Sequence, residues 1–207
     1  MRRAPLAMFG MCVVLLAACS KGSATPTVSP ATAPGGASAS PASSPSASAA
    51  TYSADGVSFD YPQGWQTLNL TATSASTNGT VVWQKAFGPG AGSDFVSVTD
   101  YSLNASVTDA NIDQQEPQTT ATITSTFQQA GGSLTSGPDK ITMGGLPALG
   151  YAGTAVDPDG NQVNIRMVLA YDGTTEYFVN CQESQAGAGT MAAACDQIIG
   201  SFSLTAA

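Results

Sequence analysis

Apolar and polar residues alternate through most of the chain beyond residue 51, which is the pattern of strands that are buried on one face. Two such runs flank Asp55-Gly56, a pair suited to a two-residue turn, so residues 51–61 are predicted to form a β-hairpin. Similar runs, separated by Gly-, Pro- and Asp-rich turns, predict the remaining strands. These cover residues 65–70, 81–87, 95–101, 141–143, 148–156, 162–170 and 175–181.

Turn residues fix how the later strands are expected to connect. Pro138-Asp139 predicts a turn before the strand at 141–143, and residues 157–161 (Asp-Pro-Asp-Gly-Asn) predict a strong hairpin turn. A second turn is predicted at residues 171–174, which contain Asp172-Gly173. The last three strands are therefore expected to form an antiparallel meander.

Residues 111–130 carry opposing signals. The Thr-rich run at 120–127 has a period of two and favours a strand. Pro117 suits a first helical turn, Glu116 suits the positive end of a helix, and Gly131 suits its termination. We predict a helix here.

A second helix is predicted near the C-terminus. Met191, Cys195, Ile198 and Phe202 recur at the spacing of one helical stripe. Strands and helices together predict an α+β fold with a central antiparallel sheet flanked by helices.

The N-terminus has the layout of a secretory signal. A positive start at Arg2-Arg3 precedes an apolar run over residues 4–15 that is too short to span a bilayer permanently. Leu16-Ala17-Ala18-Cys19 follows and resembles the bacterial lipobox. This resemblance implies that Cys19 carries a thioether-linked diacylglycerol, with acyl chains such as palmitate, and becomes the first mature residue. The alternative is an ordinary signal peptide with an incidental cysteine.

Composition then divides the chain into three parts. Residues 1–18 are predicted to be the signal peptide. Residues 19–50 comprise the lipidated Cys19 and a linker of mostly Ser, Ala, Pro, Thr and Gly, which cannot bury enough apolar surface to offset its ordering entropy. Residues 51–207 form one globular domain. The expected location is the extracytoplasmic face of the cell membrane, reached through the lipid.

Charge and histidine content exclude several classes of function. The chain has 6 Lys plus Arg against 14 Asp plus Glu. Loss of Arg2 and Arg3 would leave 6 − 2 = 4 against 14, so nucleic acid is not an expected partner. The chain contains no histidine, which removes Ser-His-Asp and Cys-His catalytic pairs and most catalytic zinc sites.

Two cysteines are left in the predicted domain, Cys181 at the end of a strand and Cys195 on the final helix. An exported domain meets an oxidising compartment, and an isolated pair there is most simply a disulfide. Two buried free thiols are the alternative.

Other polar groups are interpreted as structural rather than reactive. The acidic loop at 157–161 lacks the Gly and Glu that a calcium loop requires at its sixth and twelfth positions, so we interpret it as a turn. Arg166 is interpreted as a surface cation rather than an anion site. The carboxylate pairs Asp55–Asp60 and Asp172–Glu176 are interpreted as surface charges, and the aromatic residues Trp65, Trp83, Tyr151 and Tyr177 as core. No catalytic, cofactor-binding or metal-binding residue is predicted.

Short motifs in the domain point to a known family. They are Gly56-Val57-Ser58-Phe59-Asp60-Tyr61-Pro62-Gln63-Gly64-Trp65, Gly145-Leu146-Pro147-Ala148, Tyr177 within a meander, and Ile198-Ile199-Gly200-Ser201-Phe202. In this order they resemble the PsbP-like superfamily, especially the Lpq-type (LpqN-like) lipoproteins of actinobacteria. The resemblance implies an antiparallel sheet with helices on both sides, and an accessory, binding or scaffold role without shared catalytic residues.

These observations predict a lipid-anchored cell-envelope protein that is not an enzyme and that binds a protein partner or supports an envelope complex. The alternative is a carrier of a small apolar or amphipathic ligand held between sheet and helix. A hydrolase that uses carboxylates alone is the remote alternative.

Overall fold

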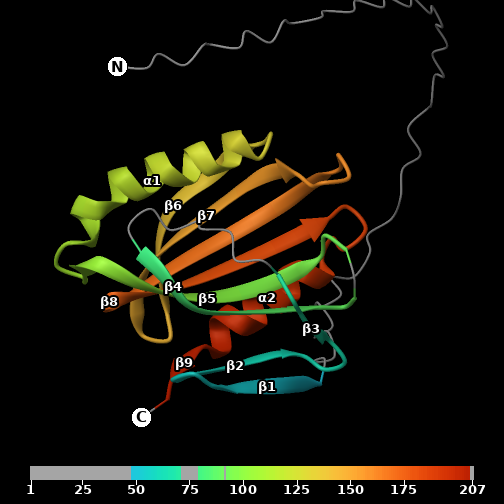
Figure 1. Cartoon of the computed structure of the whole chain (residues 1–207), viewed down its shortest axis with the longest axis horizontal. Helices are drawn as coiled ribbons and strands as arrows, with labels where there is room; N and C mark the ends of the chain where they lie inside the picture. The colour runs from blue at the N-terminus through green and yellow to red at the C-terminus, as the bar shows by residue number, and fades with distance from the viewer. Residues whose placement is uncertain (1–47, 71–78, 91, 206–207) are drawn as a thin grey trace, which may run out of the picture. The chain divides into compact units, whose positions relative to one another are not determined.

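The computed structural model describes residues 48–70, 79–90 and 92–205, so Cys12, Cys19 and most of the predicted linker lie outside the described residues. Strands dominate, and two helices interrupt them (Figure 1). The elements are β1 (Ala49–Ala54), β2 (Val57–Pro62), β3 (Gln66–Leu68), β4 (Gly79–Gly88), β5 (Phe95–Val107), α1 (Ile112–Gln129), β6 (Ser133–Met143), β7 (Leu146–Val156), β8 (Gln162–Ser184), α2 (Thr190–Ser201) and β9 (Ser203–Leu204). Neither described helix is both long and apolar enough to cross a bilayer.

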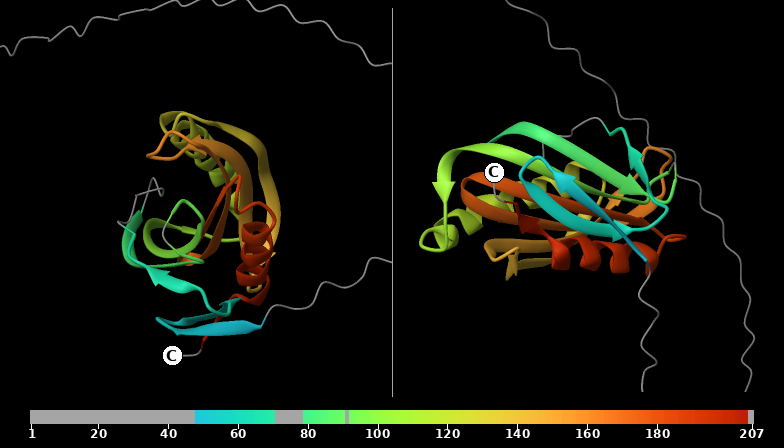
Figure 2. Two further views of the ribbon diagram at one scale, coloured as in Figure 1. Left: turned by 90° about the vertical axis from the view of Figure 1, so that its right-hand side faces the viewer. Right: turned by 90° about the horizontal axis from the view of Figure 1, so that it is seen from below.

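The strands form two antiparallel sheets. The larger has six strands in the order β3-β4-β5-β8-β7-β6, and the smaller has three in the order β1-β2-β9. Figure 2 shows the larger sheet as a strongly curved ribbon. The predicted α+β fold with a central antiparallel sheet is confirmed.

The two helices cover opposite faces of the six-stranded sheet. Neighbouring residues of a strand point to opposite faces, and in β7 Ala148 packs with the α2 side while Leu149 packs with the α1 side. On the α1 side, Ile123 and Phe127 of the helix join the core. The core on the other face contains α2 together with β2 residues such as Phe59.

The first hairpin forms where the alternation predicts it. Asp55 and Gly56 both have positive φ, 54° and 79°, which a two-residue turn matching the strand twist requires. Phe59 pairs with Tyr52 across the hairpin, and their rings stack with centroids 5.0 Å apart.

Helix α1 confirms the helical prediction for residues 111–130, against the strand preference of its threonines. The hydroxyls of Thr122 and Thr126 donate hydrogen bonds to backbone carbonyls four residues earlier, at 3.0 Å each. Ile123 and Phe127 are each 1% exposed. Burial of this apolar pair against the sheet outweighs the small propensity penalty of the threonines.

The turn predicted at residues 171–174 is wrong, and so is the three-strand meander. Strand β8 continues through this point and changes partners, because its first part pairs with β7 and its second part pairs with β5. Gly173 adopts φ 62° within an irregularity of the β5 pairing, which accommodates the Asp-Gly pair without reversing the chain.

The turn predicted at Pro138-Asp139 is also wrong, because both residues lie inside β6. The β6–β7 register shifts between Ser136 and Asp139, so the proline sits at an irregular point of the ladder. Strand β6 is the edge of the sheet, where a residue without an N–H is tolerated. An irregularity and a proline also protect such an edge from pairing with other chains.

Candidate functional site

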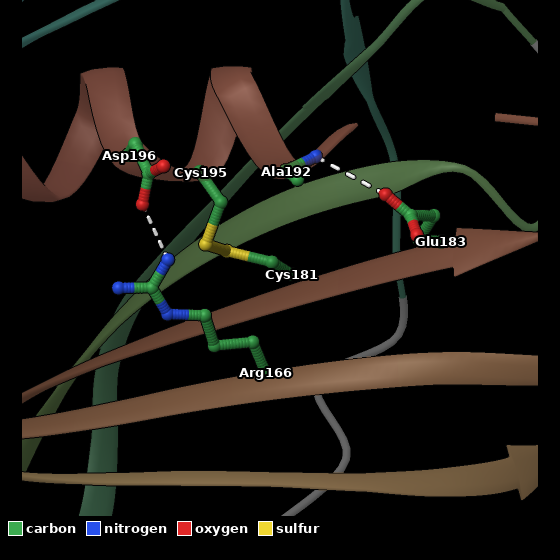
Figure 3. The surroundings of a disulfide bond; sticks show 6 residues. All are labelled: Arg166, Cys181, Glu183, Ala192, Cys195 and Asp196. Atoms are coloured by element: carbon green, nitrogen blue, oxygen red, sulfur yellow. Dashed lines mark hydrogen bonds and ion pairs between the residues drawn. A yellow bond between two sulfur atoms is a disulfide. The ribbon is translucent and has the colours of Figure 1, made fainter. Parts of the chain in front are cut away.

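The candidate site lies where α2 packs against β8, beside the predicted disulfide. Cys181 of β8 and Cys195 of α2 are bonded, with Cα atoms 5.9 Å apart and both residues almost fully buried (Figure 3). The disulfide that the cysteine count predicted is confirmed. The bond joins the strand to the helix that follows it.

A second contact holds the start of the same helix. Glu183, two residues after Cys181, accepts hydrogen bonds at Oε2 from the backbone N–H groups of Gly189 and Ala192, each at 3.2 Å. These donors lie at the positive end of α2, where a carboxylate is stabilising. The end of β8 therefore fixes α2 both covalently and by this cap.

Arg166 of β8 reaches across to α2 on the same face. Its Nη1 donates to Oδ1 of Asp196 in an ion pair (Figure 3). Ile165 and Met167 belong to the core on the opposite face, so Arg166 points away from both as the alternation predicts. Its side chain is 43% exposed, which agrees with the interpretation as a surface cation.

A groove runs along α2 next to this ion pair. Helix α2 packs mainly on β8, β5 and β2, and on the same face the part of β7 around Ala152 and Thr154 is only half-buried. That part carries small residues, and it forms a hollow of about 280 Å³ beside α2. A second hollow of about 280 Å³ adjoins it, and Ala152 and Arg166 line both. We call this surface the α2 groove and define it by Thr135, Ala152, Thr154, Arg166, Met191 and Cys195.

The chemistry of the α2 groove suits binding more than reaction. Its walls are mainly apolar, and the disulfide forms part of them. The guanidinium of Arg166 engages Asp196 through one nitrogen and has further donors for a planar polar group. Sequence reasoning missed the groove because its walls come from β6, β7, β8 and α2.

Glu176 was interpreted as a surface charge, and the structure overturns that interpretation. Its side chain faces the α1 side of the sheet and is 4% exposed. Burial raises its pKa to about 7, and a hydrogen bond from Tyr171 offsets only part of this effect. Its Oε1 has no hydrogen-bond partner among the described residues. Asp172, its predicted companion, is exposed.

Asp55 and Asp60, the other pair of carboxylates, each contact different residues. Asp60 accepts a hydrogen bond from Thr51 Oγ1 at 2.6 Å. Asp55 accepts one from the hydroxyl of Tyr52 and lies 3.9 Å from Nζ of Lys85. Each carboxylate is thus engaged by different neighbours, and the hydrolase alternative gains no support from either pair.

The acidic loop at residues 157–161 forms the predicted hairpin turn. Asp157 Oδ1 accepts the backbone N–H groups of Asp159 and Asn161 at 3.0 and 2.8 Å, and Oδ2 accepts the hydroxyl of Ser93 at 2.7 Å. The Ser93 bond is the main cause that holds the pKa of Asp157 below its usual range. Within the described residues no cluster of three potential metal ligands occurs.

The four aromatic residues that the sequence assigns to the core do pack there. Tyr177 is buried on the α2 side and its ring lies 5.2 Å from that of Phe202. Trp65 and Trp83 pack against the same cluster, and Tyr151 is buried on the α1 side.

Comparison with known proteins identifies the family. The model of the family described as PsbP-like protein matches residues 36–204, and the chain belongs to this family. The resemblance predicted from the short motifs is confirmed. No curated protein matches the chain.

A solved structure shares the fold at low sequence identity. Cyanobacterial PsbP (CyanoP) from Synechocystis sp. PCC 6803 aligns with a TM-score of 0.53 and 14% identity, covering 81% of this chain and 99% of that one. LpqN of Mycobacterium tuberculosis, described as involved in cell envelope biogenesis, aligns with a TM-score of 0.46 and 14% identity, covering 77% of this chain and 91% of that one. A structure from Bacteroides thetaiotaomicron VPI-5482 aligns with a TM-score of 0.45 and 12% identity. The alignment covers 73% of this chain but only 46% of that protein.

Proposed function

We propose that this protein is a lipid-anchored component of the cell envelope that binds a protein partner and catalyses no reaction of its own. The lipid on Cys19 would hold it at the extracytoplasmic face of the membrane. Residues 1–18 would be removed as a signal peptide, and residues 19–50 would tether the folded domain. Two or three acyl chains suffice for durable anchoring, at about 0.8 kcal/mol per buried CH₂.

The α2 groove is the observation that supports partner binding. It combines apolar walls with two charged residues, Arg166 and Glu183, and the disulfide and the Glu183 cap hold α2 in place. A surface fixed before binding loses little conformational entropy when a partner docks. Arginine is also enriched among the residues that dominate binding at protein interfaces.

Anchoring is tested by substituting Cys19. In its own host, the Cys19→Ala variant is expected to lose all incorporation of an alkyne-labelled palmitate, because only a thiol can carry the thioether-linked lipid. Cys12→Ala is the matched control, since Cys12 lies within the predicted signal peptide and its loss leaves labelling intact. Equal labelling of the Cys19→Ala variant would show that the lipid is attached elsewhere.

Partner binding is tested by photo-crosslinking in intact cells. A photoreactive amino acid at Ala152, inside the α2 groove, is expected to yield a crosslinked species with one other envelope protein. Ala121 is exposed on α1, on the opposite side of the sheet, and serves as the matched control. Crosslinking from both positions alike, or from Ala121 alone, would contradict the assignment of the groove.

A further inference from the structure

Part of the α1-facing side of the sheet is polar, and the helix borders it at Thr126. Helix α1 packs on β6 and β7. On β4, β5 and β8 the same side carries a hollow of about 290 Å³. We call it the β5 trough and define it by Gln84, Ser97, Thr126, Met167, Phe178 and Asn180.

Strand register explains why these residues meet. Gln84 of β4 pairs with Thr99 of β5, and Asn180 of β8 pairs with Ser97 of β5. The two amide side chains therefore stand on either side of β5. Ser97 and Thr99 are short and buried between them, which leaves room above the middle strand.

Both amides present a buried oxygen without a hydrogen-bond partner. Oε1 of Gln84 and Oδ1 of Asn180 are inaccessible to solvent, and neither has a partner among the described residues. The amide nitrogen of Gln84 donates to Thr99 Oγ1 at 3.0 Å, which holds that side chain in place. A buried unpaired acceptor is costly, and such groups in native proteins point to a missing ligand or water.

The rest of the lining restricts the class of ligand. Within the described residues no charged side chain lines the trough, while Met167 and Phe178 supply apolar surface. A neutral ligand is therefore preferred over an ion. Because amide oxygen and nitrogen can exchange places by rotation, hydroxyl groups are the best match, since they both donate and accept.

We propose that the β5 trough binds a small neutral molecule that carries hydroxyl groups on one side and apolar surface on the other. A rotation of each side chain turns its buried amide oxygen towards the trough, where the hydroxyls bridge Gln84 and Asn180, and the apolar surface lies against Met167 and Phe178. This site is independent of the lipid on Cys19 and of the α2 groove, which lies on the opposite face of the sheet.

The test uses cis-1,2-cyclohexanediol as probe and the full chain in detergent micelles. We expect saturable shifts of the side-chain amide NMR signals of Asn180 and Gln84. Asn180→Leu and, separately, Gln84→Met are expected to weaken binding about tenfold each, the equivalent of one hydrogen bond. Gln185→Leu changes an exposed amide outside the trough and leaves binding unchanged.

Two further readouts separate a ligand site from a structural defect. The melting temperature of the ligand-free Asn180→Leu variant is expected to equal or exceed that of the wild type, because an apolar group replaces an unpaired polar one. Cyclohexanecarboxylate, which is charged, is expected to bind more weakly than the diol. The proposal is overturned if the amide signals do not saturate, if neither variant weakens binding, or if the carboxylate binds as well as the diol.

Discussion

Replacing both Cys181 and Cys195 by alanine lowers the free energy of unfolding by about 3 kcal/mol, the value expected for closing a loop of this length. The bond spans 14 positions in sequence and removes conformations that the unfolded chain would otherwise populate. It also joins α2 to β8, so its loss should loosen the helix more than the rest of the domain.

Denaturant unfolding with and without reductant measures this effect. Reductant is expected to shift the midpoint of the wild type towards that of the double variant and to leave the variant unchanged. Amide hydrogen exchange should then show faster opening in α2 than in β7, which has no covalent tie. An unchanged midpoint in the double variant would mean that α2 is held by packing and by Glu183 alone.

Replacing Glu176 by glutamine removes a pH dependence of stability. In the folded protein the pKa of Glu176 is raised from 4.5 to about 7, chiefly by burial. Between these values the folded state keeps the proton and the unfolded state releases it, so stability falls as the pH rises through this window. Over the whole window the free energy of unfolding falls by about 3 kcal/mol, because each unit of pKa difference corresponds to about 1.36 kcal/mol.

The glutamine variant cannot ionise, so its stability relative to wild type should grow with pH. We expect the two proteins to be nearly equal at the acidic end of the window and the variant to be more stable above it. Asp172→Asn is the matched control, because it removes a carboxylate that is exposed on the same strand. A difference between Glu176→Gln and wild type that does not vary with pH would contradict the raised pKa.

Local sequence patterns predicted the elements that depend on neighbouring residues. The hairpin at Asp55-Gly56 follows from the conformations those two residues adopt readily. Helix α2 follows from the spacing of Met191, Cys195 and Ile198, all of which are buried. The disulfide followed from the number of cysteines and the predicted export, since two thiols in one exported domain leave a single pairing.

Prediction failed where the chain's long-range pairing decided the outcome. Asp172-Gly173 is a common turn pair, yet β8 passes through it because β5 and β7 supply hydrogen-bond partners on both sides of that point. Alternation alone does not say which face of the sheet the side chain of Glu176 points to. Its burial depends on the packing of the sheet beneath α1, and its neighbour Tyr171 belongs to the same core.

The α2 groove and the β5 trough also could not be predicted from local sequence patterns. Gln84 and Asn180 lie almost a hundred positions apart and meet only because each pairs with β5. Arg166 and Asp196 meet because the disulfide and the cap bring α2 back over β8. Neither arrangement leaves a periodic pattern or a motif in the chain.

The sequence by itself determined the class of fold, the family, the disulfide pairing and the turns at residues 55–56 and 157–161, because alternation, cysteine count and turn preference act through nearby residues or composition. Only the tertiary structure decided the continuous course of β8, the burial of Glu176 and the positions of the α2 groove and the β5 trough. Those depend on strand register and on which face each helix covers, and packing between distant segments of the chain sets both.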